Sequence, residues 1–236
     1  DWMNWSTKLR GRQPAALKKI SIKLHDHIEY IKFEQFIFFQ QWIELKQYAH
    51  DHGISLFGDM PIFVAHDSAE VWAHREFFSV NKQGRATHVA GVPPDYFSEN
   101  GQRWGNPLYA WKTIQQDQFS WWINRMRTQL SLFDIVRIDH FRGFEANWEI
   151  PAEEETAING QWVKTPGMAL LNVLHEKFDP LPIIAEDLGI ITDEVNALRD
   201  NFNIPGMKVL QFAFSGDSHN PYLPHNCIRN CVIYTG

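Results

Sequence analysis

The sequence predicts an α/β fold with a parallel sheet, for which a (β/α)8 TIM barrel is the favoured form. Three observations support this: five short apolar runs do not alternate with polar residues, helical patterns separate them, and acidic residues follow three of them. A doubly wound open sheet is the competing architecture, but it normally carries a Gly-rich phosphate loop that this sequence lacks. Acidic side chains at several strand ends are typical of the C-terminal face of a barrel.

The predicted strands are short and rich in Ile and Val, as expected for strands that are buried on both faces. They lie at residues 54–57, 135–138, 183–185, 207–214 and 231–234. A barrel needs about eight strands, so we expect this chain to be a fragment that is incomplete at both ends.

Apolar residues recur at helical spacing in four segments between these strands. The segments lie at residues 38–49, 119–130, 165–174 and 192–198. We expect Gly53 to follow the first helix, and Asp117 and Thr192 to be the N-caps of the second and fourth. Pro166 is expected at the first position of the third helix.

Two segments depart from this alternation of strands and helices. Residues 84–110 are rich in Gly, Pro and aromatic residues and are longer than a plain connection, so we expect a functional loop rather than a disordered one. Residues 145–165 contain three consecutive glutamates and are expected to form a solvated excursion. The chain is therefore predicted to be one partial catalytic barrel, residues 1–236, with an insertion around 84–110.

Charge and composition exclude several kinds of partner. The formal net charge of -6 gives no basic footprint for nucleic acid. No stretch reaches the ~18 consecutive apolar residues of a membrane span. Cys227 and Cys231 have no second pair at metal-ligand spacing, so we expect buried free thiols, in keeping with a reducing cytoplasm, rather than a zinc site.

The strand at 135–138 leads into the first candidate for chemistry. Alternate residues of a strand share a face, so Arg137 and Asp139 are expected to point the same way. A guanidinium beside Asp139 would keep its carboxylate ionised, as a nucleophile requires. His140 would lie just past the strand, near the rim of the sheet. A purely structural Arg–Asp pair is the alternative.

The second candidate is the acidic pair Glu186 and Asp187, which closes another apolar run. Their side chains must diverge, so one can face a site while the other makes a structural bond. A glutamate among apolar walls has a raised pKa and can act as a general acid, although such residues also cap helices. Together, Asp139 and Glu186 fit the two-carboxylate scheme of glycoside chemistry.

Five further residues are candidates for sugar binding. Tyr96 and Trp104 offer flat apolar faces for sugar rings, whereas Asp95 and Asn106 could bond to hydroxyl groups. Asp59, close after the first apolar run, is either a further polar contact or a carboxylate that stabilises a turn.

Four blocks of sequence, in this order, resemble the amylomaltase or disproportionating-enzyme family of 4-α-glucanotransferases, which are relatives of the α-amylases. The blocks are DMPIFVAHDSAEVW at 59–72, GVPPDYFSENGQRWGNPLY at 91–109, RIDHFRG at 137–143 and AEDLG at 185–189. The resemblance extends over nearly the whole chain, and the second block is the feature that separates this family from ordinary amylases.

The resemblance implies an enzyme that transfers an α-1,4-glucan segment to glucose or a maltooligosaccharide by a retaining double displacement. It implies Asp139 as the nucleophile and Glu186 as the acid/base, with no metal and no organic cofactor. Arg137 and His140 would hold the nucleophile and the sugar. The glucan cleft would be lined by Asp59, Asp95, Tyr96, Trp104 and Asn106. The family's third carboxylate would lie beyond Gly236, so this chain alone is expected to be inactive.

Three other functions are consistent with the same residues. An α-amylase-type hydrolase uses the same two carboxylates with water as the acceptor, and a metal-dependent barrel hydrolase would use Asp139, His140 and Glu186 as ligands. A glucan-binding module without catalysis is the third. A cytoplasmic location is expected, and a plastid is equally compatible with a plant or algal source.

Overall fold

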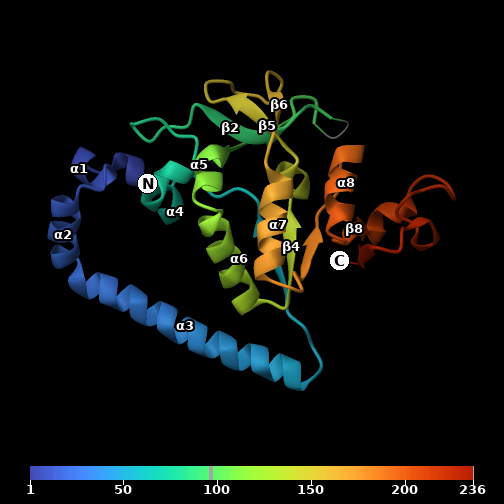
Figure 1. Ribbon diagram of the computed structural model, residues 1–236, viewed down its shortest axis with the longest axis horizontal. Helices are drawn as coiled ribbons and strands as arrows, with labels where there is room; N and C mark the ends of the chain where they lie inside the picture. Colours follow the sequence, from blue (N-terminus) through green and yellow to red (C-terminus); the bar gives the residue numbers. More distant parts are fainter. Residues whose placement is uncertain (96–97, 236) are drawn as a thin grey trace.

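The structure is a computed structural model that describes residues 1–95 and 98–235. Its centre is a three-stranded parallel sheet of β1 (Phe57–Pro61), β4 (Ile135–Asp139) and β7 (Ile183–Ala185), in that order. A second parallel sheet pairs β8 (Gly206–Val209) with β9 (Cys231–Tyr234). The Ala185 N–H donates to the Pro205 carbonyl at 2.9 Å, which joins the two sheets edge to edge. Parallel strands therefore alternate with helices along the chain, as predicted (Figure 1).

Strand bounds agree with the sequence prediction at 135–138, 183–185 and 231–234, but differ at the other two. The first strand is β1, which starts at Phe57 and contains Asp59, because its residues pair one for one with those of β4. The predicted strand at 207–214 is correct only as far as Val209. Beyond it, the 3-10 helix η4 (Leu210–Phe214) leaves Phe214 84% exposed, so this part of the apolar run does not enter the core.

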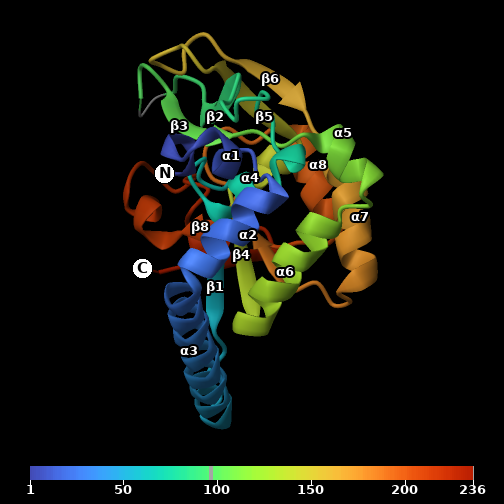
Figure 2. The ribbon, with the colours of Figure 1, turned by 90° about the vertical axis from the view of Figure 1, so that its left-hand side faces the viewer.

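Three helices cover the outer side of these strands: α6 (Ser120–Leu132), α7 (Gly167–Lys177) and α8 (Asp193–Asn201) (Figures 1 and 2). Their inward side chains, such as Trp122, Leu170 and Val195, join the strand residues Val136 and Ile138 in the main core. This burial of apolar surface is the dominant stabilising contribution.

The predicted helix caps are partly confirmed. Thr192 is the N-cap of α8, as expected. Asp117 instead ends α5 (Trp111–Gln116), and the N-cap of α6 is Phe119, whose backbone turns into the left-handed region with φ 57. Pro166 is the N-cap of α7 rather than its first residue, a difference within the usual spread of helix bounds.

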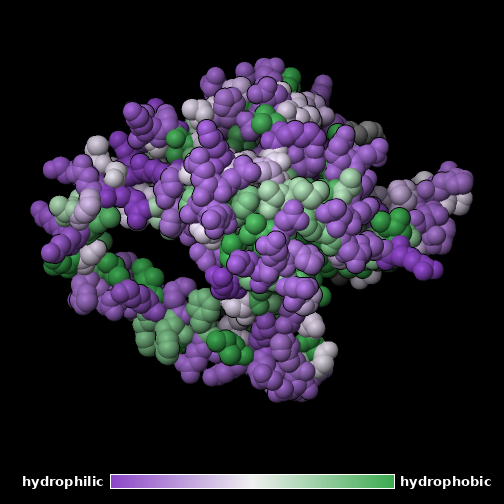
Figure 3. All heavy atoms as spheres, in the orientation of Figure 1, coloured by the Kyte–Doolittle hydropathy of each residue, from purple (hydrophilic) through white to green (hydrophobic). Residues whose placement is uncertain are grey.

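The N-terminal region contains the longest helix, α3 (His25–Asp51), which is followed by Gly53 at φ 70 as predicted. Only its C-terminal half meets the core: the Trp42 indole donates to the Leu132 carbonyl at 2.9 Å, and Ala49 is buried. Phe38 and Leu45 of the predicted apolar stripe stay exposed, and Figure 3 shows hydrophobic side chains along this helix. The elements before α3 are η1 (Trp2–Asn4), α1 (Thr7–Arg10) and α2 (Pro14–Lys23).

The two segments that break the alternation form one antiparallel sheet, contrary to prediction. Its strands are β2 (His88–Val92), β3 (Gln102–Pro107), β5 (Ala146–Pro151) and β6 (Gln161–Lys164), in the order β3-β2-β5-β6. Residues 84–110 are thus largely a hairpin, and residues 145–165 are a second hairpin rather than a solvated excursion. The sheet lies beyond the C-terminal end of β4, with a small core of Val89, Ile150 and Ala157 (Figure 1).

The remaining elements are short: α4 (Ala69–Ala73), η2 (Arg75–Phe77), η3 (Phe141–Phe144) and η5 (Pro224–Asn226). Cys227 and Cys231 are both free thiols, but each is partly exposed, so the prediction that they are buried is wrong. Within the described ranges, no helix is both long and apolar enough to cross a membrane.

Candidate active site

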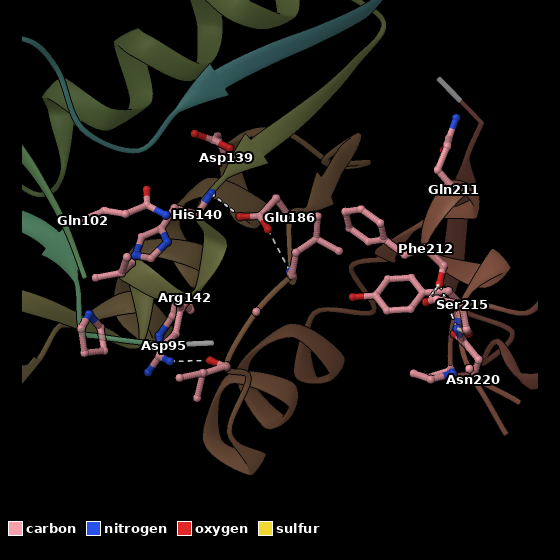
Figure 4. Close-up of a pocket in the computed structure, with 18 of the residues that line it drawn as sticks. Asp95, Gln102, Asp139, His140, Arg142, Glu186, Gln211, Phe212, Ser215 and Asn220 are labelled. Carbon is pink, nitrogen blue, oxygen red and sulfur yellow. Dashed lines mark hydrogen bonds between the residues drawn. The ribbon is translucent and has the colours of Figure 1, made fainter. Parts of the chain in front are cut away.

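A cleft of about 1430 Å³ opens beyond the C-terminal ends of β4 and β7, beneath the antiparallel sheet (Figure 4). Segment 211–222, which follows β8, forms its far wall. Of the residues predicted from the sequence, the cleft is lined by Asp95, Trp104, Arg137, Asp139, His140 and Glu186. Residues from separate parts of the chain therefore meet in one cavity.

Arg137 links two carboxylates through one guanidinium. The register of β1 and β4 places Asp59 opposite Arg137, and the Nε and Nη2 atoms of Arg137 lie 3.0 and 2.8 Å from the two oxygens of Asp59. The same Nη2 lies 3.1 Å from Oδ1 of Asp139, which confirms that Arg137 and Asp139 share a face. Burial lowers the pKa of Arg137, but its bonds to Asp59 and the surrounding carboxylates outweigh burial and raise it. A fixed positive charge thus accompanies Asp139.

Glu186 directly follows β7 and faces the cleft beside Asp139 (Figure 4). Its two carboxylate oxygens accept hydrogen bonds from the backbone N–H groups of His140 and Leu188, each at 2.8 Å. Burial raises the pKa of Glu186, and the negative charge of Asp139 adds to that effect, while the two backbone bonds and Arg137 oppose it. The net shift is upward, as expected for a general acid.

Asp187 turns away from the cleft, as the divergence of adjacent side chains requires. Its buried carboxylate forms an ion pair with Arg199 of α8 and accepts the Met207 N–H at 2.8 Å. Asp187 therefore ties β7 to α8 and β8, and leaves Glu186 as the acidic side chain of this pair that faces the site.

His140 lies immediately after β4 in the left-handed region, with φ 57. Its imidazole packs perpendicular to the Trp104 indole, with ring centroids 4.8 Å apart. Burial and the charge of Arg142 lower the pKa of His140 to about 4, so the ring is neutral near pH 7. Nε2 is buried and has no hydrogen-bond partner among the residues that the structure describes.

The other predicted sugar-binding residues have different placements. Trp104 is 38% exposed in the cleft, and Asp95 lines it while its carboxylate accepts the Ser98 N–H at 2.8 Å. Asn106 does not line the cleft, because its side-chain amide donates to the Val64 carbonyl at 3.0 Å. Asp59 likewise is not among the residues that line the cleft, and it bonds to Arg137, which does line it. Tyr96 lies outside the described residues.

The cleft is also lined by residues that the sequence did not predict as part of a site, namely Arg142, Trp162 and much of segment 211–222. The Arg142 guanidinium lies 3.7 Å from the ring centroid of Trp162 and also donates to the Ile190 carbonyl. Trp162 lies in segment 145–165, which the sequence analysis interpreted as a solvated excursion. A tryptophan within such a polar stretch was the feature that could have indicated a binding role. Segment 211–222 was not predicted to line a site, because its first residues were assigned to the strand expected at 207–214.

Metal ligands are not grouped at this site. Across residues 1–95 and 98–235, no set of three or more His, Cys, Asp or Glu side chains is placed to hold a metal ion. The geometry instead provides two carboxylates in unlike surroundings, a permanent cation and a neutral imidazole.

Residues 1–236 match the sequence profile of a family described as 4-alpha-glucanotransferase. The chain is 55% identical over 237 residues to the 4-alpha-glucanotransferase of Thermus thermophilus, covering 100% of the chain and 47% of that relative. It is 48% identical over 235 residues to the chloroplastic/amyloplastic 4-alpha-glucanotransferase of Solanum tuberosum, covering 41% of it. Amylomaltase from Streptococcus agalactiae, solved in complex with acarbose, superimposes with a TM-score of 0.94 at 40% identity, over 100% of this chain and 48% of the other. The chain thus spans about half the length of the curated relatives it matches.

Proposed function

The chain belongs to the 4-alpha-glucanotransferase family, and from this premise we propose that it carries the nucleophile and the acid/base of a glucan-transfer reaction. The enzyme cleaves an α-1,4-glucan and passes the severed segment to glucose or a maltooligosaccharide with retention of configuration. The observation that carries the proposal is that Asp139 and Glu186 face one cleft in opposite electrostatic settings.

In the first step, a carboxylate oxygen of Asp139 attacks the anomeric carbon of the donor. The glycosidic C–O bond breaks, and the leaving oxygen takes the proton of Glu186. The ion pair with Arg137 supports this role, because the guanidinium holds a positive charge against the attacking carboxylate. The raised pKa of Glu186 supports the other role, because the acid must hold its proton until the bond breaks.

In the second step, the Glu186 carboxylate removes the proton from an acceptor hydroxyl group. The hydroxyl oxygen attacks the anomeric carbon, and the bond to Asp139 breaks. Two inversions give net retention. A cleft lined by Trp104, Trp162 and Phe212 supports transfer to a sugar, because apolar walls hold an acceptor ring and displace water.

We assign the other residues as follows. Neutral His140, which lines the cleft, bonds to the bound sugar, and Arg137 positions Asp139. Asp95 and Trp104 contact the glucan directly. Asp59 acts indirectly, by positioning Arg137. Asn106 also acts indirectly, by its hydrogen bond to the Val64 carbonyl. Tyr96 completes the sugar-binding set by resemblance.

We further propose that residues 1–236 form one part of a (β/α)8 barrel, with residues 84–110 as the substrate insertion. The order of the parallel strands and the position of β2 and β3 over the cleft support this domain assignment. For a plant source we propose a plastid location, which the name of the Solanum tuberosum relative supports. For any other source we propose a cytoplasmic location.

The test is an assay on maltotriose with the complete protein that carries these residues. Glucose together with maltopentaose and longer products is the expected result, with loss of both in Asp139→Asn. Asp26→Asn, on exposed α3, is the matched control and should retain activity. Glucose and maltose without longer products would indicate a hydrolase and overturn the proposal of transfer.

A further inference from the structure

Arg142 is a charged residue of the cleft to which the proposed reaction gives no role. It lies in η3, shortly after β4, and it is only 7% exposed. Burial lowers the pKa of its guanidinium, because removal from water disfavours the charged form. A buried cation is unfavourable unless its donors are used, so the contacts of Arg142 indicate what it does.

One contact of Arg142 is with the segment that follows the proposed acid/base. The Nη1 atom of Arg142 donates to the Ile190 carbonyl. In the same segment, residues 188–190, the Leu188 N–H donates to Oε1 of Glu186 at 2.8 Å. Figure 4 draws both bonds as dashed lines. Arg142 is therefore linked to Glu186 through a stretch of three residues.

Segment 188–190 has few other restraints. Within the described part of the chain, its backbone makes only the two hydrogen bonds to Glu186 and Arg142. The segment lies outside the helices and strands, Gly189 adopts φ 81, and Ile190 is 55% exposed. A loop with so few buried contacts moves more readily than a core element. The bond from Arg142 is therefore important for where the segment lies.

We propose, building on the proposed function, that Arg142 is a positioning residue for Glu186. By holding the Ile190 carbonyl it keeps segment 188–190 in place, and the Leu188 N–H of that segment then holds one oxygen of the Glu186 carboxyl group. The His140 N–H holds the other oxygen at 2.8 Å. Proton transfer depends on this orientation, because the acid must lie within hydrogen-bond reach of the leaving oxygen.

The second contact of Arg142 guides the choice of variant. Its guanidinium lies 3.7 Å from the ring centroid of Trp162. Arg142→Met removes the donors but leaves an unbranched chain that can still pack against the indole. Because Ile190 is exposed, water can replace the lost donor, and we expect this variant to fold.

The test compares two substrates with the complete protein that carries these residues. Maltotriose needs a proton on its leaving oxygen, whereas α-maltosyl fluoride releases fluoride without one. In Arg142→Met, kcat on maltotriose should fall about tenfold with little change in KM, because the general acid is misplaced. Fluoride release in a single turnover should stay within about twofold of the wild-type rate. Arg127→Met, at an exposed position of α6, is the matched control and should leave both rates unchanged.

Arg142→Gln is polar but too short to reach the same carbonyl. It should behave as Arg142→Met does, and it decides the question if the methionine variant does not fold. An unchanged kcat on maltotriose would overturn the proposal. Equal slowing on both substrates would also overturn it, because the effect would then lie in sugar binding or in the fold.

Glu186→Gln, measured beside these variants, separates this inference from the function on which it rests. If Glu186→Gln is equally slow on both substrates, the acid/base assignment fails and this inference fails with it. If Glu186→Gln recovers on the fluoride but Arg142→Met shows no such pattern, this inference alone is wrong.

Discussion

Arg137 holds Asp59 with the Nε–Nη2 edge of its guanidinium, at 3.0 and 2.8 Å, and still reaches Asp139 with Nη2 at 3.1 Å. Two carboxylates thus share one cation across the β1–β4 pairing. The bidentate bond fixes the guanidinium plane, whereas the single contact to Asp139 leaves that carboxylate 45% exposed to the cleft. Asp59 is therefore a positioning residue for the proposed nucleophile.

The Asp59→Asn substitution tests this arrangement. It replaces a charged bidentate acceptor with a neutral amide, so Arg137 loses its orientation. We expect kcat to fall about 10- to 100-fold with little change in KM, since one charge-assisted bond contributes roughly 1.5–3 kcal/mol. Kinetics on maltotriose measure both constants. An unchanged kcat would mean that Arg137 needs no support from Asp59.

The Glu186→Gln substitution tests the acid/base assignment. Loss of the proton donor should lower kcat by about 10²- to 10⁴-fold on maltotriose. α-Maltosyl fluoride should restore the first step, because fluoride leaves without a proton. If fluoride release in a single turnover, which reports the first step alone, is equally slow, Glu186 does something other than donate a proton to the leaving group.

The raised pKa of Glu186 also predicts a pH dependence. The first step needs protonated Glu186, so kcat/KM should fall as pH rises through the pKa of this group in the free enzyme. Because burial shifts that pKa upward, the fall should be centred above the ordinary glutamate value of 4.5. A pH profile measured with maltotriose gives its position, and a fall centred at or below 4.5 would contradict the shift.

His140 predicts a loss of stability in mild acid. Its pKa is lowered to about 4 by burial, from 6.5 when unfolded, so the unfolded chain binds this proton more readily. The neutral His140 ring therefore contributes to the stability of the folded state above pH 6.5, and this contribution is lost as pH falls from 6.5 to about 4. It amounts to about 3 kcal/mol.

The measurement is the free energy of unfolding in urea at several pH values, for the wild type and for His140→Gln. Other groups titrate in both proteins, so the difference between the two curves isolates His140. A difference that does not change between pH 6.5 and pH 4 would show that the ring is not held neutral.

Trp162 should affect substrate binding more than chemistry. It lines the cleft on β6 and packs on Arg142, with the guanidinium 3.7 Å from the ring centroid. Trp162→Ala should raise KM about tenfold with a small effect on kcat, because stacking contributes roughly 1–2 kcal/mol to binding. Trp162→Phe keeps an aromatic face and should recover most of the loss. A fall in kcat alone would contradict a binding role.

The Asp187–Arg199 pair should matter for stability. Both side chains are buried, so Asp187→Ala leaves the buried Nη1 of Arg199 and the Met207 N–H without their acceptor and should cost about 3–5 kcal/mol. Arg199 also pairs with Asp200, whose side chain is 58% exposed. Asp200→Ala is thus a matched control on the same arginine, and its cost should stay below about 1 kcal/mol. Equal losses of Tm in the two variants would refute the distinction.

Local sequence patterns determined several parts of this protein. The apolar runs at 183–185 and 231–234 have the bounds of β7 and β9. The two-residue period of a strand placed Arg137 and Asp139 on one face, and the divergence of adjacent side chains separated Glu186 from Asp187. These features depend on neighbours along the chain, so the residues themselves encode them.

The tertiary structure decided the rest, because pairing between distant segments is set by register and packing rather than by local period. Asp59 meets Arg137 only because β1 and β4 pair in one register. Segments 84–110 and 145–165, which look like loops in the sequence, form one sheet only because β2 pairs with β5. The pairing of β6 with β5 then places Trp162 over Arg142, and the sheet covers the cleft. The sequence thus specified the chemical groups of the candidate site, and the fold determined which of them face one another, since only packing brings residues this far apart into contact.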